Sequence, residues 1–341
     1  MQKETVKNKV QQITEKLDQG VTSIFESGKL AEYLNVLSKF HKYSSRNNIL
    51  IYQQMPTATK VAGYVTWQKE FNRQVNKGES GIAILMPTPY KVKEEMTKID
   101  PNTQKPMLDM NGKEIMEEVE IIIPKFKVGY VFDVSQTSGE PLPSIVTGLQ
   151  GDVNRYEDLL KALKSISSVD ISFESIPTGA KGYYSRIDRK IGIQNGMSEL
   201  QTIKTLIHEI AHSELHSDFY GSRKDKRTKE VEAESVAYTV AKYFDLDTSD
   251  YSFAYVGNWS KTQELNELKA SLDIIQKKST DLITRIDEVL LDLSRDKITD
   301  KNIELNKTPL KEKLAKVKEK QSVLDQRKEK NTSKSKGELQ I

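Results

Sequence analysis

The sequence concentrates its histidines in one short segment. Only four histidines occur in 341 residues, and three of them, His208, His212 and His216, stand at steps of four. Residues four apart on an α-helix lie one turn above each other, so His208 and His212 can offer two imidazole nitrogens to one cation. Glu209 follows the first histidine, and in a helical HExxH pattern this carboxylate takes a proton from metal-bound water. The segment HEIAH therefore predicts a metal site with a catalytic glutamate.

A catalytic zinc site takes a third protein ligand and keeps a fourth position open for water. The downstream segment EVEAESVAY supplies three carboxylates. We expect Glu230 to bind the metal and Glu234, one turn later, to orient a ligand histidine through its free ring N–H. The reverse assignment and the use of Glu232 stay open. For His216 we favour a partly exposed histidine near the negative end of the helix dipole over a metal ligand.

Composition limits the kind of metal and the setting. The sequence has no cysteine, which excludes disulfides, thiolate zinc sites and cysteine nucleophiles, so a metal must use nitrogen and oxygen ligands. Two imidazoles and one carboxylate favour Zn²⁺, although manganese or cobalt can substitute. No apolar run approaches the roughly 20 residues that cross a bilayer, and the N-terminal segment is charged. We therefore expect a cytoplasmic protein without membrane association.

The periodicity of apolar residues predicts a mixed α+β chain. Helices are expected over 3–18, 30–37, within 40–56, over 63–71 and 155–165, and at TIKTLIHEIAHSELH and EVEAESVAYTVAKYF, with a charged loop over 221–229 between the last two. Strands are expected on both sides of a glycine turn in 74–87, within 119–134, over 169–173, and as a pair across 181–193. A heptad over 265–293 and a shorter one over 310–324 predict a helical hairpin.

Charge is distributed in blocks. Residues 39–93 hold nine Lys/Arg against two acidic residues, whereas 94–120 hold three against eight, with an acidic insertion at 94–118. The length favours two domains. We expect an N-terminal α+β domain over 1–135, a linker over 136–150, a second domain that carries HEIAH over 151–295, and a charged helical or disordered tail over 296–341.

The arrangement of HEIAH on one helix and EVEAE on the next resembles zincin metallopeptidases of the gluzincin type. That resemblance implies that metal-bound water attacks a carbonyl while Glu209 transfers the proton. It also implies that the strand KIGI before the first helix lies at a sheet edge and binds extended substrate. A tyrosine or histidine commonly stabilises the oxyanion in such enzymes; Tyr220 and Tyr238 are candidates between which the sequence does not choose.

The basic block alternates cationic with aromatic side chains. Single-stranded nucleic acid is bound by a positive groove for phosphates and aromatic faces for bases. The segment FHKYSSRNNILIYQQMPTATKVAGYVTWQKEFNRQVNKGESGIAILMP resembles the N-terminal domain of ArdC-type antirestriction proteins, and the resemblance extends over about residues 25–260. It implies a single-stranded-DNA-binding domain joined to a zincin domain, carried by plasmids and conjugative elements, that protects incoming DNA from restriction. The insertion 94–118 and the C-terminus do not match that pattern.

The resemblance and the composition together give candidate DNA contacts. We expect phosphate contacts from Lys42, Arg46 and Lys77, and base stacking from Tyr43, Tyr64 and Trp67. Trp67 can equally belong to the core, while Asn47 and Asn48 can cap or buttress a turn.

Three functions are open at this point. The leading one is an antirestriction protein that binds single-stranded DNA and carries a zinc-dependent peptidase site. The second is a DNA-binding protein whose metal is purely structural. The third is a regulatory metalloprotease that cleaves a repressor or a restriction subunit, with DNA as its locator.

Overall fold

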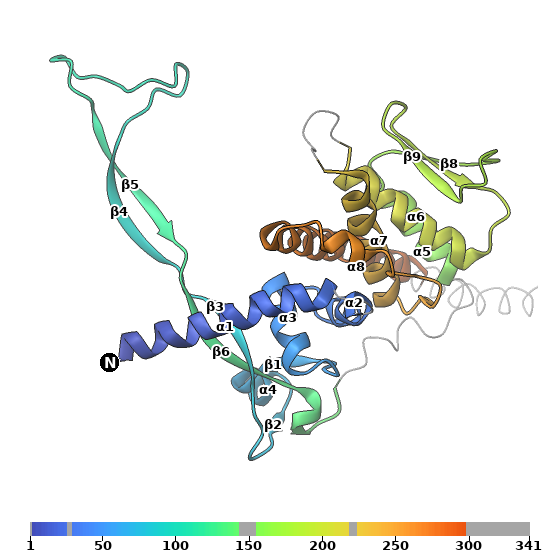
Figure 1. The fold of residues 1–341 in the computed structure, drawn as a ribbon, viewed down its shortest axis with the longest axis horizontal. Coiled ribbons are helices and arrows are strands. Elements are labelled where there is room, and N and C mark those ends of the chain that lie inside the picture. Colours follow the sequence, from blue (N-terminus) through green and yellow to red (C-terminus); the bar gives the residue numbers. More distant parts are fainter. Residues whose placement is uncertain (1, 26–28, 143–154, 218–223, 298–341) are drawn as a thin grey trace, which may run out of the picture.

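The computed structural model describes residues 2–25, 29–142, 155–217 and 224–297. Helices lie beside two three-stranded sheets and two smaller strand pairs, which confirms the mixed α+β class (Figure 1). One sheet belongs to the N-terminal part and the other to the part that carries HEIAH.

The N-terminal part packs three helices against a small antiparallel sheet. The helices are α1 (Gln2–Phe25), α2 (Lys29–Lys39) and α3 (Ser45–Gln54), and the sheet has the order β1 (Val61–Gly63), β6 (Phe126–Asp133), β3 (Ile82–Pro87). The Asn47 side-chain amide donates to the Leu85 carbonyl at 3.0 Å, and its oxygen accepts the Leu85 N–H at 2.9 Å. Asn48 donates to the Tyr43 carbonyl at 2.9 Å. Both asparagines therefore buttress local structure, Asn47 by joining α3 to β3.

The glycine turn at 76–80 connects strands that do not pair with each other. β2 (Arg73–Val75) pairs with β7 (Thr137–Gly139), while β3 pairs with β6. The Arg73 guanidinium donates to the Thr137 and Gly139 carbonyls and thereby holds the first pair together. Residues 137–139, expected in the linker, are thus strand. Between β1 and β2 lies α4 (Tyr64–Glu70), and η1 (Val134–Gln136) follows β6.

The acidic insertion forms the outer part of a two-stranded ribbon that projects away from the rest of the chain (Figure 1). Its strands are β4 (Tyr90–Thr97) and β5 (Met116–Ile123). Lys91 pairs with Glu120 at 2.6 Å and Lys93 with Glu118 at 2.5 Å, all on exposed side chains. Exposed ion pairs contribute little stability, about 0–1 kcal/mol each, so they leave the ribbon only weakly stabilised.

The C-terminal part places a second sheet beside the HEIAH helix. Its elements are α5 (Arg155–Ile166), β8 (Asp170–Glu174), β9 (Gly182–Ser185), β10 (Lys190–Gln194), α6 (Glu199–Leu215), α7 (Lys226–Tyr243) and α8 (Val256–Ser260). The strand order is β8-β10-β9. The prediction that KIGI lies at the edge is therefore wrong: this strand is β10, and Ile191 and Ile193 are fully buried at the centre. The strand at the edge beside α6 is β9. The loop predicted over 221–229 is also shorter, because α7 begins at Lys226.

The heptad over 265–293 lies on a single helix that covers residues 265–297. Its apolar positions are buried in the main core or packed against it, which confirms the heptad's buried face. Asp273 on this helix accepts a hydrogen bond from Ser45, Gln276 donates to the His41 carbonyl at 2.8 Å, and Arg285 binds Glu214 at 2.8 Å. The helix therefore touches both the start of α3 and the end of α6. The second heptad, over 310–324, lies outside the described residues.

One apolar core runs through both parts of the chain. It contains Leu34 and Leu37 of α2 together with Leu206 and Ile210 of α6, and α2 packs directly on α7. The predicted domain boundaries at 135 and 151 stay a prediction; most of the expected linker, from 143 on, and the tail from 298 lie outside the described segments. Among the helices that the structure describes, none has the length and apolar character to cross a bilayer.

A buried carboxylate holds the corner where β6 ends. Asp133 accepts the backbone N–H groups of Thr59 at 2.7 Å, Lys60 at 3.0 Å and Ser135 at 3.0 Å. Burial by itself raises the pKa of Asp133, but these hydrogen bonds stabilise the anion and bring the pKa below its ordinary value. The stabilisation is therefore complete above the unfolded-state pKa, about 4, and disappears as pH falls through the lower folded-state pKa.

We predict that Asp133→Asn lowers the free energy of unfolding by about 1.5–3 kcal/mol at pH 7, because the amide nitrogen cannot accept the backbone N–H groups. Urea unfolding measures the change. Asp109→Asn is the matched control, since Asp109 accepts two backbone N–H groups in an exposed turn of the ribbon. The difference between Asp133→Asn and wild type must shrink below about pH 4, where the carboxylate protonates; a constant difference down to pH 2 would contradict the assignment.

Candidate functional site

Helix α6 presents its two central histidines on the side that faces α7. Ser198 caps the helix by accepting the Gln201 N–H at 3.3 Å. The opposite side is buried through Ile203, Leu206 and Ile210, which fixes the rotation of the helix. The rings of His208 and His212 lie 4.6 Å apart between centroids, with their Nε2 atoms 3.1 Å apart.

Helix α7 brings one carboxylate to these two nitrogens. Asp225 caps α7 by accepting the Thr228 N–H at 3.0 Å. One turn into the helix, Glu230 Oε2 lies 3.7 Å from His208 Nε2 and 3.5 Å from His212 Nε2. Among the residues that the structure describes, these three side chains form the group whose ligand atoms all lie within 4.8 Å of one another.

The three atoms suit a small divalent cation. A tetrahedral ion with bonds of about 2.0–2.2 Å holds its ligand atoms about 3.3–3.6 Å apart, and the distances of 3.1, 3.5 and 3.7 Å lie around that range. The donor set of two imidazoles and one carboxylate is typical of catalytic zinc sites. The residues present therefore fit a metal ion with one open position.

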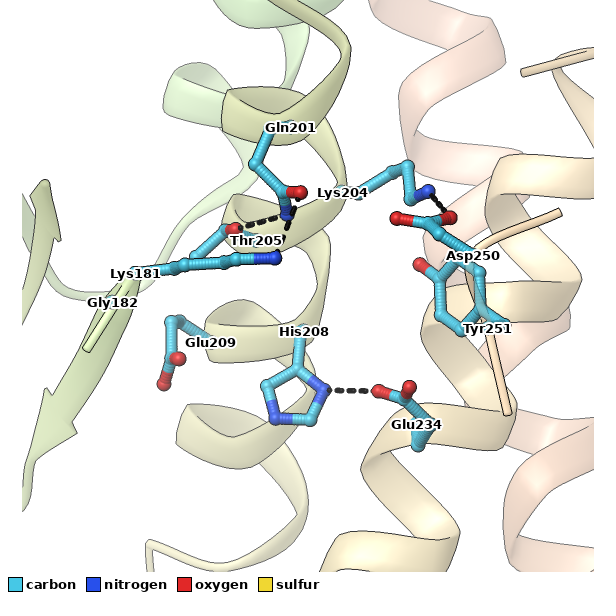
Figure 2. Close-up of a pocket in the computed structure, with 10 residues that line it drawn as sticks. All are labelled: Lys181, Gly182, Gln201, Lys204, Thr205, His208, Glu209, Glu234, Asp250 and Tyr251. Carbon is cyan, nitrogen blue, oxygen red and sulfur yellow. Dashed lines mark hydrogen bonds and ion pairs between the residues drawn. The ribbon is translucent and has the colours of Figure 1, made fainter. Parts of the chain in front are cut away.

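Glu234 lies behind the first histidine. Its Oε2 is 3.1 Å from His208 Nδ1, an ion-pair contact that favours a proton on Nδ1 and leaves Nε2 free for a cation (Figure 2). Burial opposes the charge on His208, but Glu234, Glu209 and Glu230 raise the pKa of His208 above its ordinary value. The pKa of His212 is lowered, chiefly by burial. The His212 contact lowers the pKa of Glu230, which stays anionic.

Glu209 lies on the side of α6 that faces β9. Gly182 of β9 packs so closely that a Cβ there would lie 3.2 Å from Glu209 Cγ and 2.6 Å from Thr205 Cγ2. A glycine at this position thus lets the edge strand approach the helix. Burial raises the pKa of Glu209 to about 7, while its contact with the Tyr184 backbone acts in the opposite direction. A carboxylate with such a pKa can both take and return a proton near neutral pH.

Two cavities meet at this group. One of about 330 Å³ extends from His208 and Glu209 past Tyr251 to the Lys204–Asp250 ion pair (Figure 2). The other, of about 690 Å³, lies on the side of His212 and Glu230. Both are lined by Gly182 of the edge strand as well as by His208 and Glu209. A ligand can therefore lie along β9 and pass directly over the histidines.

The tyrosines at the site differ from the two that the sequence offered. Tyr238 is buried against Tyr251 and Phe253 and lines neither cavity, while Tyr220 lies outside the described residues. Tyr251 lines the smaller cavity. Burial, reinforced by nearby Glu234, raises the pKa of Tyr251, and the same two causes raise that of the partly exposed Tyr255. Both hydroxyls stay protonated and can donate hydrogen bonds; no motif marked either of them.

His216 does not occupy the exposed position that we favoured. It ends α6, but its side chain is buried. Its Nε2 lies 3.3 Å from Glu232 Oε2, and its Nδ1 lies 3.1 Å from His212 Nδ1. The prediction of a partly exposed histidine is wrong because the 265–297 helix and α7 cover this end of α6. Glu232 faces away from the three converging ligand atoms.

The candidate DNA contacts fall into three groups. Lys42, Arg46 and Lys77 have exposed side chains. Trp67 is only 1% exposed and donates its indole N–H to the Phe132 carbonyl at 2.8 Å, so it is a core residue and cannot stack on a base. Tyr43 is partly buried and packs with the small core cluster beside Val61.

Tyr64 lies on the other side of the β1-β6-β3 sheet. It is 46% exposed and packs edge-on against Phe132, with ring centroids 6.4 Å apart. Along β6, Tyr130 and Phe132 alternate with the buried Val131, so they share the outer face. Tyr130 is 53% exposed, and the absence of a side chain at Gly81 leaves room for both rings. Period-two alternation in KVGYVFD was the signal that could have identified Tyr130.

The chain is similar to known proteins over part or most of its length. Residues 3–132 match the family of N-terminal domains of anti-restriction factor ArdC. An uncharacterized Bacillus anthracis protein, pXO2-81, is 29% identical over 339 residues, which cover 91% of this chain and 56% of that protein. DNA primase TraC of Escherichia coli is 27% identical over 214 residues, or 58% of this chain and 19% of the primase. The chain thus spans about half or less of the length of these relatives.

Crystal structures of the antirestriction protein ArdC from plasmid R388 also align with the chain. The metal-free form has a TM-score of 0.43 and 22% identity and covers 74% of this chain and 86% of ArdC. The Mn(II)-bound form has a TM-score of 0.44 and 19% identity and covers 73% and 85%. The match over residues 3–132 confirms the resemblance to ArdC in this region: this part of the chain is similar to the N-terminal domain of anti-restriction factor ArdC.

Proposed function

We propose that this chain is a DNA-binding antirestriction protein whose C-terminal half hydrolyses peptide bonds with the help of a bound zinc ion. The convergence of His208 Nε2, His212 Nε2 and Glu230 Oε2 beside the Glu209 carboxylate supports the hydrolytic part. The ArdC-type N-terminal domain supports the antirestriction part.

The residues at the site would have different roles in hydrolysis. Zn²⁺ bound by His208, His212 and Glu230 would polarise a carbonyl and lower the pKa of water. Glu209 then accepts the proton of the attacking water and returns it to the leaving amine, a role that its raised pKa suits. Tyr251, whose hydroxyl stays protonated, can donate a hydrogen bond to the oxygen that becomes negative.

The edge strand β9 favours an extended peptide as substrate. β9 pairs with β10 through one side, and its other side borders the cavities. Backbone N–H and C=O groups at a sheet edge can pair with an added strand. A peptide added to this edge would have a carbonyl within reach of Glu209. The role that we expected from KIGI therefore passes to β9.

A purely structural metal is the rival interpretation. Structural zinc sites are closed by four protein ligands. Here three ligand atoms converge within the described part of the chain, and cavities border them. Glu209 is not required to hold the ion, yet it is buried next to it at the cost of desolvation. These features favour hydrolysis, with a repressor or restriction subunit as a candidate substrate.

Single-stranded DNA binding is supported by a separate observation, the open aromatic face of the N-terminal sheet. Tyr64, Phe132 and Tyr130 offer ring surface there, and the turn with the exposed Lys77 precedes Gly81 in sequence. Gln136 holds this turn, accepting the Asn76 N–H at 2.9 Å and donating to the Ser80 carbonyl at 2.9 Å. An exposed lysine on a held turn, together with exposed flat rings, suits a strand of unpaired bases.

We predict that Glu209→Gln lowers the rate of cleavage by about 10²–10⁴-fold without loss of zinc, because it removes the proton acceptor and leaves the three ligands. Fluorescein-labelled casein with equimolar Zn²⁺ or Mn²⁺ measures cleavage, and elemental analysis measures the bound metal. Glu199→Gln, an exposed glutamate at the start of the same helix, is the control. Cleavage by Glu209→Gln at the wild-type rate would exclude Glu209 as the base. A wild-type protein that binds zinc but cleaves nothing would favour the structural role.

For DNA, we predict that Tyr130→Ala weakens binding of a fluorescent oligo(dT) strand by about 1–3 kcal/mol, the contribution of one stacked base. Tyr90→Ala, which removes a similarly exposed tyrosine from the acidic ribbon, is the matched control and should bind as wild type does. Fluorescence anisotropy at constant salt measures both. Equal affinities of the two variants would remove the aromatic face from the DNA site.

We further predict that Lys77→Ala reduces the slope of log affinity against log salt concentration by about 0.7, the value for one phosphate contact on a single strand. The same oligo(dT) titration, repeated between 50 and 300 mM salt, measures it. Lys98→Ala is the control, because Lys98 pairs with Glu117 on the ribbon. A wild-type affinity that does not vary with salt would eliminate phosphate contacts altogether.

A further inference from the structure

Behind the metal ligand His212 lies a buried chain of polar groups that the hydrolytic mechanism does not use. His212 Nδ1 faces His216 Nδ1 at 3.1 Å, and His216 Nε2 faces Glu232 Oε2 at 3.3 Å. Glu232 has 0% exposure, and Lys224 Nζ lies 2.6 Å from its Oε1. Ser271, on the 265–297 helix, donates to the same oxygen at 2.8 Å.

The proton positions in this series of polar groups can be assigned by starting from Glu232. Lys224 donates to both oxygens of Glu232 and Ser271 donates to one of them, so Glu232 acts as a carboxylate acceptor. A carboxylate only accepts hydrogen bonds, so His216 Nε2 carries the proton toward it. With that proton on Nε2, His216 Nδ1 is the acceptor that faces the N–H of His212 Nδ1. His212 Nε2 keeps its lone pair, directed at His208 and Glu230.

We propose that His216, held by Glu232, is the positioning residue of His212, fixing the tautomer and ring orientation that the metal needs. It corresponds to Glu234, whose carboxylate does this directly for His208. Metal-binding histidines almost always donate their second ring N–H to such a partner, and loss of that partner commonly weakens metal binding about 10–100-fold. The inference rests on the proposed metal site and adds a residue to it.

The same geometry excludes His216 as a ligand. One of its nitrogens faces His212 Nδ1, the atom that points away from the other two ligand atoms, and its second nitrogen faces Glu232. Neither ring nitrogen is directed at the group formed by His208, His212 and Glu230. His216 thus orients His212, and the spacing of four residues places His216 one helical turn after His212.

Replacements of His216 separate positioning from simple packing. In His216→Asn the amide oxygen lies close to the position of Nδ1 and can still accept the His212 N–H. In His216→Phe the ring is kept and both nitrogens are lost. We expect zinc to bind about 10–100-fold more weakly to His216→Phe, and His216→Asn to recover most of that loss. Competition with a chromophoric chelator measures zinc affinity, and circular dichroism melting confirms that each variant is folded.

The zinc affinities of these variants decide whether His216 positions His212. Wild-type zinc affinity in folded His216→Phe would overturn the proposal, as would an equal loss in the Asn and Phe variants, which would indicate packing alone. If wild type binds zinc and Glu230→Gln does not, the metal site stands whatever His216 does. If wild type binds no zinc, the proposed hydrolytic function fails first and the positioning role with it.

Two serines on the 265–297 helix test the part of this polar series that contains Glu232. Ser271 and Ser279 are both buried on the 265–297 helix, and Ser279 has no hydrogen-bond partner for its hydroxyl among the described residues, whereas Ser271 binds Glu232. Ser271→Ala should weaken zinc binding relative to Ser279→Ala, because only the first removes a donor that keeps Glu232 in place. Equal zinc affinities would show that Lys224 and α7 hold Glu232 without the C-terminal helix.

Discussion

The packing of α6 against α7 is the constraint on which the candidate site depends. Two histidines on one helix can face the same way only if that helix is rotated correctly, and the third ligand must arrive from a neighbour at one particular height. Burial of Ile203, Leu206 and Ile210 sets the rotation of α6. The Asp225 cap sets where α7 begins, and hence that Glu230 rather than Glu232 faces the histidines. An error of one residue in that start would rotate Glu230 about 100° away.

Charge at the site is balanced by pairing each histidine with a carboxylate. Glu234 lies behind His208, and Glu232 lies behind His212 with His216 between them. An unpaired buried carboxylate would tend to protonate and lose its ability to orient a ring. Lys224 prevents this at Glu232, the fully buried member of the pair. Glu209 is buried as well, and this burial raises its pKa to about 7.

Sequence spacing predicted the parts of the site that depend on one helix or on two consecutive helices. HEIAH and EVEAE each set their own faces, so the juxtaposition of His208, His212 and Glu230 could be anticipated. The strand order could not be predicted, because KIGI has the same local pattern at a sheet edge or at the centre. It is the central strand because it pairs with β8 on one side and with β9 on the other. The burial of His216 depends on a helix about fifty residues later in the chain, and no local pattern near His216 encodes that contact. Trp67 was ambiguous for the same reason.

The 265–297 helix shows how the two halves of the chain can depend on each other. Within about one turn, Ser271 binds Glu232 behind the metal ligands and Asp273 binds Ser45 at the start of α3, next to the exposed Arg46. Further along, Gln276 and Thr280 both donate to the His41 carbonyl. A helix moves as a rigid body over such short distances, so a displacement of α3 would also shift the position of Ser271 relative to Glu232. The shared core through α2 and α7 opposes such a displacement, so the geometry of the candidate site depends on the packing between the two halves.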